Sequence, residues 1–341
     1  MTSLQMVAAL AAGSLAAVWA GATVLERSTE QLADHFGLPS DVRGAVVTAL
    51  GSSFPEFTAT VVAIALHDRV ELAIGIVVGS AVFKVLVVPA VSALLSPGSG
   101  LRTDRELVYQ ETGFYVLAVA SVLLVLALSV IYNPVETAAG GAGQAGELTR
   151  TLVLAPLGLY VFFLFLQYAD AAEHGAGRTS GDRSALEYLT GLVVALVFVG
   201  VGVEGLVRAA IEFSEAFGTS EFLWGLTVVG AGASVPEVFV GVLAARNDEP
   251  GVSISTVLGS STFDLLVAIP VAVLAVGAVT VNFGTVVPLF AFLVVAALLL
   301  LTVVRTDLKV STAEAVGLLL VYGGFLGWMA AESVGRLALL A

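Results

Sequence analysis

The chain has 341 residues, of which 58% are hydrophobic and only 12% are charged, with a net charge of −13 and no cysteine. Soluble domains are nearer ~45–50% apolar and ~25% charged, so this composition excludes a soluble globular protein and predicts an all-α integral membrane protein. The acidic balance argues against a nucleic-acid partner, and the lack of cysteine excludes disulfides, thiolate metal sites and cysteine nucleophiles.

Ten apolar runs are long enough to cross a bilayer, because a hydrocarbon core of ~30 Å needs ~20 apolar residues of helix. They occupy residues 4–25, 43–66, 71–95, 112–132, 151–169, 186–210, 222–245, 252–277, 283–304 and 313–335. No basic segment precedes the first run, which is therefore predicted to be a membrane span and not a cleaved signal peptide. The runs predict a multi-pass protein of the cell membrane, in contact with the lipid bilayer.

The basic residues of the loops predict the orientation, because loops rich in Lys and Arg stay in the cytoplasm. With the N-terminus outside, the inside loops hold nine basic residues and the outside segments hold four. We therefore expect both termini to be extracellular. The fourteenth basic residue, Lys84, lies inside the third span, in the apolar stretch VVGSAVFKVLVVPAV (77–91).

The two halves of the chain share a pair of motifs. The first half has GSSFPE (51–56) and GSAVFK (79–84), and the second has GASVPE (232–237) and GSSTFD (259–264). The copies begin in the second and seventh spans, and because five is odd, the second copy enters the membrane from the opposite side. The sequence thus predicts two inverted five-helix repeats, residues 1–170 and 186–341, joined by a short cytoplasmic linker at 171–185.

Proline lies in the first motif helix of each half. Pro55 and Pro236 each remove a helix hydrogen bond, which predicts bent helices and free backbone carbonyls near Ala49 and Gly230. Such carbonyls are tolerated at membrane depth only beside protein or a water-filled cavity.

Each motif places a hydroxyl and a charged side chain three or four residues apart, which puts both on one helix face. The pairs are Ser53–Glu56, Ser80–Lys84, Ser234–Glu237 and Ser260–Asp264. Calcium takes ~6–8 oxygen ligands from carboxylates, carbonyls and water, and inverted-repeat transporters bind their substrates near the midplane. The pattern therefore predicts a midplane cation site. For a single acid or serine, a helix–helix hydrogen bond is the alternative.

On these motifs the whole chain resembles the sodium/calcium exchanger family of the calcium/cation antiporter superfamily, in its prokaryotic form without a regulatory loop. The family pattern is G-[TS]-S-x-P-E on one helix and G-S-N-x-F-[ND] on the next, in each half. The resemblance implies a secondary antiporter that exchanges calcium for sodium by alternating access, is not an enzyme, uses no cofactor and has no evident protein partner. It implies ion-binding roles for Ser52, Ser53, Glu56, Ser80, Ser234, Glu237, Ser260 and Asp264.

Several residues depart from the family pattern. Ala233 lacks a hydroxyl, Ala81 and Ser261 replace an asparagine, and Lys84 replaces an amide or a carboxylate. An ammonium group donates three hydrogen bonds and accepts none, so Lys84 cannot ligate a metal. We expect it to face the ion site and to pair with Asp264 or a glutamate, since an unpaired buried charge is costly. The alternative is a lipid-facing lysine that snorkels to the headgroups.

Other functions stay open on the sequence. Because Lys84 removes one unit of negative charge, a proton-coupled or monovalent-selective cation antiporter of the same fold is the main alternative. A membrane-embedded enzyme is disfavoured, since no nucleophile–base pair, no histidine within a span and no H-E-x-x-H motif is found. A passive channel is disfavoured less strongly, and a saturable flux that requires a counter-ion would exclude it.

Overall fold

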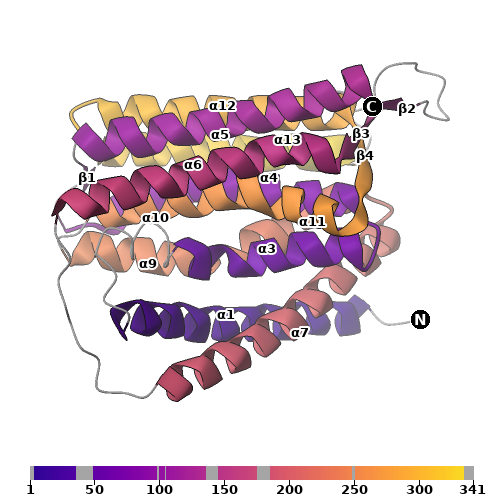
Figure 1. The fold of residues 1–341 in the computed structure, drawn as a ribbon, viewed down its shortest axis with the longest axis horizontal. Helices are drawn as coiled ribbons and strands as arrows, with labels where there is room; N and C mark the ends of the chain where they lie inside the picture. Colours follow the sequence, from indigo (N-terminus) through magenta and orange to yellow (C-terminus); the bar gives the residue numbers. More distant parts are fainter. Residues whose placement is uncertain are drawn as a thin grey trace.

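The computed structural model describes residues 4–35, 49–97, 100–103, 105–135, 145–174, 185–247 and 250–333 (Figure 1). The helices of the first half are α1 (Leu4–His35), α3 (Ala49–Ala65), α4 (Val70–Leu95), α5 (Arg105–Tyr132) and α6 (Arg150–His174). The second half begins with α7 (Ala185–Phe217) and ends with α12 (Phe283–Arg305) and α13 (Thr312–Ser333).

Two helical stretches of the second half are composite. One consists of α8 (Glu221–Trp224), the π-helix η2 (Gly225–Ala231) and α9 (Val235–Arg246). The other consists of α10 (Pro250–Phe263), the π-helix η3 (Asp264–Ala268) and α11 (Ile269–Val276). Each stretch carries one of the two motifs of the second half, and each changes helix type at or next to a residue of its motif.

The ten predicted spans each coincide with a helical stretch, which confirms the fold class. Within the described ranges, nine stretches are long and apolar enough to cross a membrane. The remaining predicted span is α3, of which Ala49–Ala65 is described while residues 43–48 lie outside the described part. Residues 175–184 of the predicted linker also lie outside it, so the proposed division into two halves at that linker stays a prediction.

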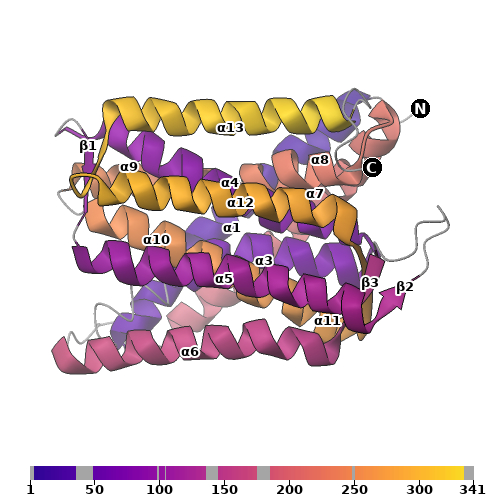
Figure 2. The ribbon, with the colours of Figure 1, turned by 90° about the horizontal axis from the view of Figure 1, so that it is seen from above.

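Two small antiparallel sheets lie at opposite ends of the bundle (Figures 1 and 2). At one end β1 (Gly100–Arg102) pairs with β5 (Lys309–Ser311), with Leu101 opposite Val310. At the other end β3 (Ala145–Thr149) pairs with both β2 (Pro134–Val135) and β4 (Ala278–Asn282). Because α4 leads into β1 and α11 leads into β4, the second motif helices of the two halves run in opposite directions.

Helix α4 lies at the centre of the molecule. Every residue from Leu72 to Ala90 is buried, so no face of this stretch is left for lipid. The backbone of α4 lies against those of α8 and η2, and glycines of α4 permit this approach: a methyl group on Gly75 would meet Phe222 of α8, and one on Gly79 would meet Leu226 of η2. Small residues at such contacts are the usual basis of close helix packing in membranes.

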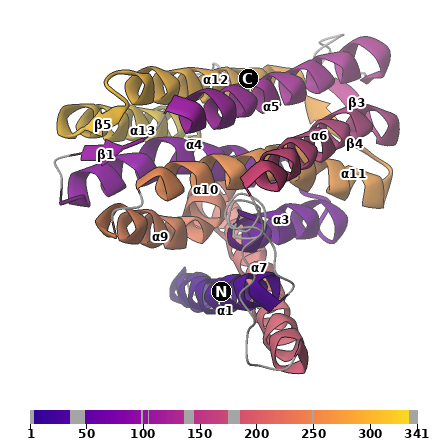
Figure 3. The same cartoon turned by 60° about the vertical axis from the view of Figure 1, so that its left-hand side comes forward.

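Helices α1 and α7 form a pair at the edge of the bundle, below α3 in Figure 1 and projecting from the other helices in Figure 3. Their crossing is close, because a methyl group on Gly202 of α7 would meet Val18 of α1. Large apolar side chains such as Val193 and Val201 are exposed on α7, as expected of a helix that faces lipid.

Candidate cation site

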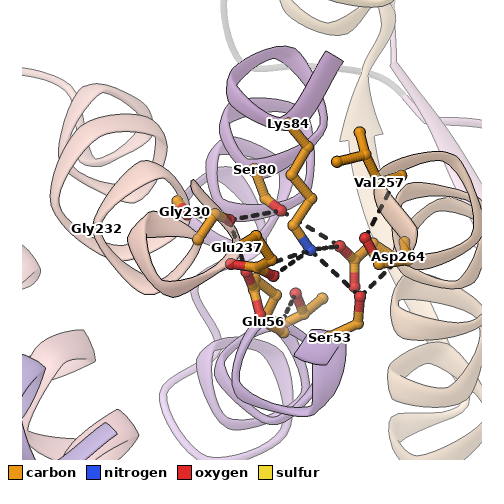
Figure 4. Close-up of polar contacts among 12 residues, drawn as sticks. Ser53, Glu56, Ser80, Lys84, Gly230, Gly232, Glu237, Val257 and Asp264 are labelled. Atoms are coloured by element: carbon orange, nitrogen blue, oxygen red, sulfur yellow. Dashed lines mark hydrogen bonds and ion pairs between the residues drawn. The ribbon is translucent and has the colours of Figure 1, made fainter. Parts of the chain in front are cut away.

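The motif residues of both halves converge on one buried point (Figure 4). Helix α3 contributes Ser53 and Glu56, and α4 contributes Ser80 and Lys84. The second half contributes Ser234 immediately before α9, Glu237 in its first turn, and Asp264 as the first residue of η3. The point lies where the two inverted repeats meet, as the sequence predicted for a transporter site.

The Lys84 ammonium lies at the centre of this cluster. Its Nζ is 3.0 Å from Asp264 Oδ2, 3.1 Å from Glu237 Oε1 and 3.3 Å from Glu56 Oε1, and it donates to Ser53 Oγ over 3.2 Å. Glu237 is 4% exposed and the other four residues are not exposed at all. The structure therefore agrees with the predicted pairing and contradicts the snorkelling alternative, because α4 offers Lys84 no lipid-facing side.

Serine hydroxyls join the charged groups of the two halves. Ser234 Oγ lies 2.6 Å from Glu56 Oε1, to which it donates, and 3.1 Å from Ser80 Oγ. Ser80 in turn donates to Asp264 Oδ2 over 3.2 Å. The hydroxyls thus link Glu56 to Asp264 across the interface between the repeats.

Ser260 and Ser52 take positions different from those of the other predicted ligands. The Ser260 hydroxyl donates to the Val257 carbonyl of its own helix (3.1 Å), whereas the Ser260 carbonyl accepts from Ser53 Oγ (3.0 Å). Ser260 therefore brings a backbone oxygen to the cluster in place of the expected hydroxyl. Ser52 is only half-buried on α3, in contrast to the fully buried Ser53, and its role as a ligand stays a prediction.

The backbone near Pro236 differs from the expectation. The prediction of a free carbonyl near Gly230 is wrong, because the Gly230 oxygen accepts from the backbone nitrogen of Ser234 (3.3 Å) and lies 2.9 Å from the Ser234 hydroxyl. The proline ring has no N–H for the residue four positions earlier, which is Gly232. The Gly232 carbonyl accepts instead from Trp19 Nε1 of α1 (2.9 Å), a contact that the sequence pattern did not indicate.

The described residues of the first half show no matching change of helix type. Helix α3 stays α-helical on both sides of Pro55, and the expected free carbonyl near Ala49 stays a prediction. In the second half η2 precedes the motif, and η3 begins at Asp264 itself. Single π-helical turns inside α-helices are rare and occur often at functional sites.

Several carboxylate oxygens of the cluster have no hydrogen-bond donor. Among the described residues, Glu56 Oε2, Asp264 Oδ1 and both oxygens of Glu237 are buried without a hydrogen bond, although Glu237 Oε1 lies close to the ammonium. In the same part of the chain, no three His, Cys, Asp or Glu side chains are arranged to enclose a metal ion directly. The carboxylates surround the ammonium of Lys84 instead.

Another charged group lies apart from this cluster. Glu204 of α7 contacts His67 Nε2 (2.9 Å) and accepts from Arg208 Nε (2.6 Å), and its side chain is 29% exposed. Glu204 is therefore a carboxylate that is paired with basic side chains outside the cluster.

The match to a known protein family covers the same two halves of the chain. A family model described as "Sodium/calcium exchanger protein" matches residues 6–169 and 187–331. The inner membrane protein YrbG of Escherichia coli is 26% identical over 307 residues, which cover 86% of this chain and 87% of YrbG. The sodium/calcium exchanger MaX1 of Methanosarcina acetivorans is 25% identical over 341 residues, covering 90% and 93%.

A solved structure shows a similar fold. The sodium–calcium exchanger NCX_Mj, soaked with sodium and strontium, matches with a TM-score of 0.61 over 94% of this chain and 97% of its own, at 22% identity. This likeness supports the arrangement of ten membrane helices in two inverted repeats.

Proposed function

Because the chain belongs to the sodium/calcium exchanger protein family, we propose that it is a secondary antiporter that moves calcium across the membrane in exchange for sodium. The observation that carries this proposal is the convergence of three carboxylates, Glu56, Glu237 and Asp264, on one buried point between the repeats. Cation antiport itself is the activity of the family.

The charge of the cluster favours binding of a divalent cation. With its acids ionised, the cluster has three negative charges and one ammonium, a formal net charge of −2. Buried charge without compensation is unfavourable, and the orphaned oxygens of Glu56, Glu237 and Asp264 are the hard ligands that calcium takes. Calcium–oxygen distances are ~2.3–2.6 Å, shorter than the 3.0–3.3 Å that separate the nearest carboxylate oxygens of the cluster from the ammonium.

The two glutamates are the proposed centre of the divalent site. Glu56 and Glu237 occupy equivalent positions in the two repeats and approach the same Lys84 nitrogen from opposite halves. The hydroxyls of Ser53, Ser80 and Ser234, together with backbone carbonyls, are the proposed additional ligands of sodium. Because both ions use the same oxygens, they compete, and this competition at a site that opens to one side at a time couples their movements.

Flux measurements in proteoliposomes test the proposal. Vesicles containing the full chain are loaded with sodium, diluted into sodium-free buffer and followed for calcium uptake. We expect rapid uptake that saturates with calcium and stops when potassium replaces internal sodium. Equal uptake with potassium inside and no other gradient would contradict coupling and indicate a channel.

A second candidate is a proton-coupled or monovalent-selective antiporter, favoured by the ammonium at the centre of the cluster. In the same vesicles, a pH gradient without sodium would drive calcium uptake by a proton-coupled protein. Sodium efflux that calcium neither requires nor inhibits would indicate a monovalent-selective one.

We further propose that both termini face the outside of the cell. Helix α1 begins and α13 ends at the end of the bundle that carries β2, β3 and β4 (Figures 1 and 2). The opposite end has Arg102 of β1 across from Lys309 of β5, and basic residues gather on the cytoplasmic side of membrane proteins. A tag after Ala341 should be accessible from outside and one near Gly177 only from inside; both positions lie outside the described residues. Reversed labelling would overturn this orientation and leave the repeat intact.

A further inference from the structure

We propose that the Lys84 ammonium is a fixed cation of the transport site, which replaces one transported monovalent ion and makes the exchange electroneutral, with two sodium ions moved for each calcium ion. This inference rests on the proposed sodium/calcium exchange. It concerns the number of charges that cross the membrane, which the assignment to the family does not determine.

The position of the ammonium is that of a bound ion. Lys84 Nζ has four oxygen neighbours at 3.0–3.3 Å, one each from Ser53, Glu56, Glu237 and Asp264. These oxygens come from both repeats, as a central transported cation would require. Asp264 Oδ2, which lies 3.0 Å from the nitrogen, is thereby less available to a further sodium ion.

The ammonium is also held in place by its helix. Lys84 lies between buried residues on every side of α4, and α4 is continuous from Val70 to Leu95 without a break at this position. A methyl group on Gly75 would meet Phe222 of α8 and one on Gly79 would meet Leu226 of η2, so the backbone of α4 packs closely against the second half at these two points. A cation attached to such a helix stays in the membrane while free ions enter and leave.

The charge sum follows from these contacts. Three carboxylates and one fixed ammonium leave a formal charge of −2, which one calcium ion or two sodium ions neutralise. A third sodium ion would leave an uncompensated positive charge inside the protein, which is strongly unfavourable. Both loaded forms of the site are then neutral, and no net charge crosses the membrane in a complete cycle.

Steady-state calcium gradients at clamped membrane potential test this inference on the unmodified chain. With two sodium ions per calcium, a tenfold sodium gradient sustains about a hundredfold calcium gradient. This ratio should be the same at zero potential and at about 100 mV of either sign, because no net charge moves. With three sodium ions, one charge crosses per cycle, so about 100 mV would change the ratio by about 50-fold.

Neutral variants of the lysine give the complementary result. Lys84→Gln and Lys84→Met leave a site of charge −3, so we expect a third sodium ion, a steeper dependence of calcium uptake on sodium, and a flux that responds to voltage. Arg208→Gln is the control, because it removes a positive charge that contacts Glu204 outside the cluster. It should change neither the sodium dependence nor the response to voltage.

The outcomes separate this inference from the function on which it rests. Absence of sodium-driven calcium flux would overturn both. Sodium-driven flux that is voltage-dependent in the unmodified chain would overturn the inference alone, as would a proton counter-flux abolished by Lys84→Gln. If the Lys84 variants do not fold, the voltage response of the unmodified chain still decides.

Discussion

The two halves of the molecule carry equivalent motifs, yet they place opposite charges at the equivalent position of the second motif helix. In the first half this residue is Lys84, within the continuous α-helix α4. In the second half it is Asp264, the first residue of the π-helix η3. The two groups contact each other over 3.0 Å. The difference shows that two inverted repeats with equivalent motifs can still build an asymmetric site, because the repeat brings equivalent positions face to face.

Substitution of the two glutamates tests whether the two halves contribute equally to calcium binding. We expect Glu56→Gln and Glu237→Gln each to weaken calcium binding by at least about a hundredfold, since a close unit-charge interaction in partly screened surroundings amounts to ~4 kcal/mol. Calcium-dependent uptake measures the effect, and Glu204→Gln, the same change outside the cluster, should leave it unaltered. A large effect from one glutamate alone would show that only one half holds the ion.

Exchanging the two charges tests the pair directly. Lys84→Asp and Asp264→Lys should each lower the free energy of unfolding by ~3–5 kcal/mol, because each places two like charges beside each other at buried positions. The double variant restores one ammonium and three carboxylates, so it should recover more than half of that loss. Thermal unfolding of the purified variants in detergent gives the double-mutant cycle. A double variant no more stable than the weaker single variant would show that the positions are not interchangeable.

A substitution at the close contact between α4 and η2 should have a smaller effect on the free energy of unfolding. Gly79→Ala should lower the free energy of unfolding by ~1–3 kcal/mol, because the added methyl group meets the backbone of Leu226. Gly324→Ala on α13 is the matched control, with no atom within 4 Å of the added carbon. It should be neutral or stabilising by up to ~1 kcal/mol, since alanine favours helix more than glycine does. Equal shifts in melting temperature for both would contradict the described contact.

The smallest expected effect concerns the Gly232 carbonyl, which Pro236 leaves without its helix hydrogen bond. Trp19→Phe removes the donor to the Gly232 carbonyl and should lower the free energy of unfolding by about 1 kcal/mol. Trp328→Phe is the control, because the Trp328 Nε1 atom is buried without a hydrogen-bond partner in the described structure. A loss as large in the control would mean that ring size, and not the hydrogen bond, accounts for the effect.

Much of the fold is determined by the sequence itself. The apolar runs locate the observed helices, because length and hydropathy are local properties that a bilayer selects. The helix ends are less well placed: the run 4–25 corresponds to Leu4–His35 and the run 186–210 to Ala185–Phe217. The two copies of the motif, five spans apart, determine that the halves are inverted. Spacings of three and four residues place Ser53 beside Glu56 and Ser80 beside Lys84, since they depend only on helix geometry.

Only the tertiary structure decides which residues each helix face contacts. The sequence predicted that Lys84 pairs with Asp264 or a glutamate, whereas it contacts all three acids, because helices of both halves approach it at once. Ser260 shares a helix face with Asp264, yet its hydroxyl bonds to Val257, since a serine can satisfy itself on the preceding turn. Spacing along one helix specifies its faces, but the distance and rotation between helices distant in sequence specify the contacts.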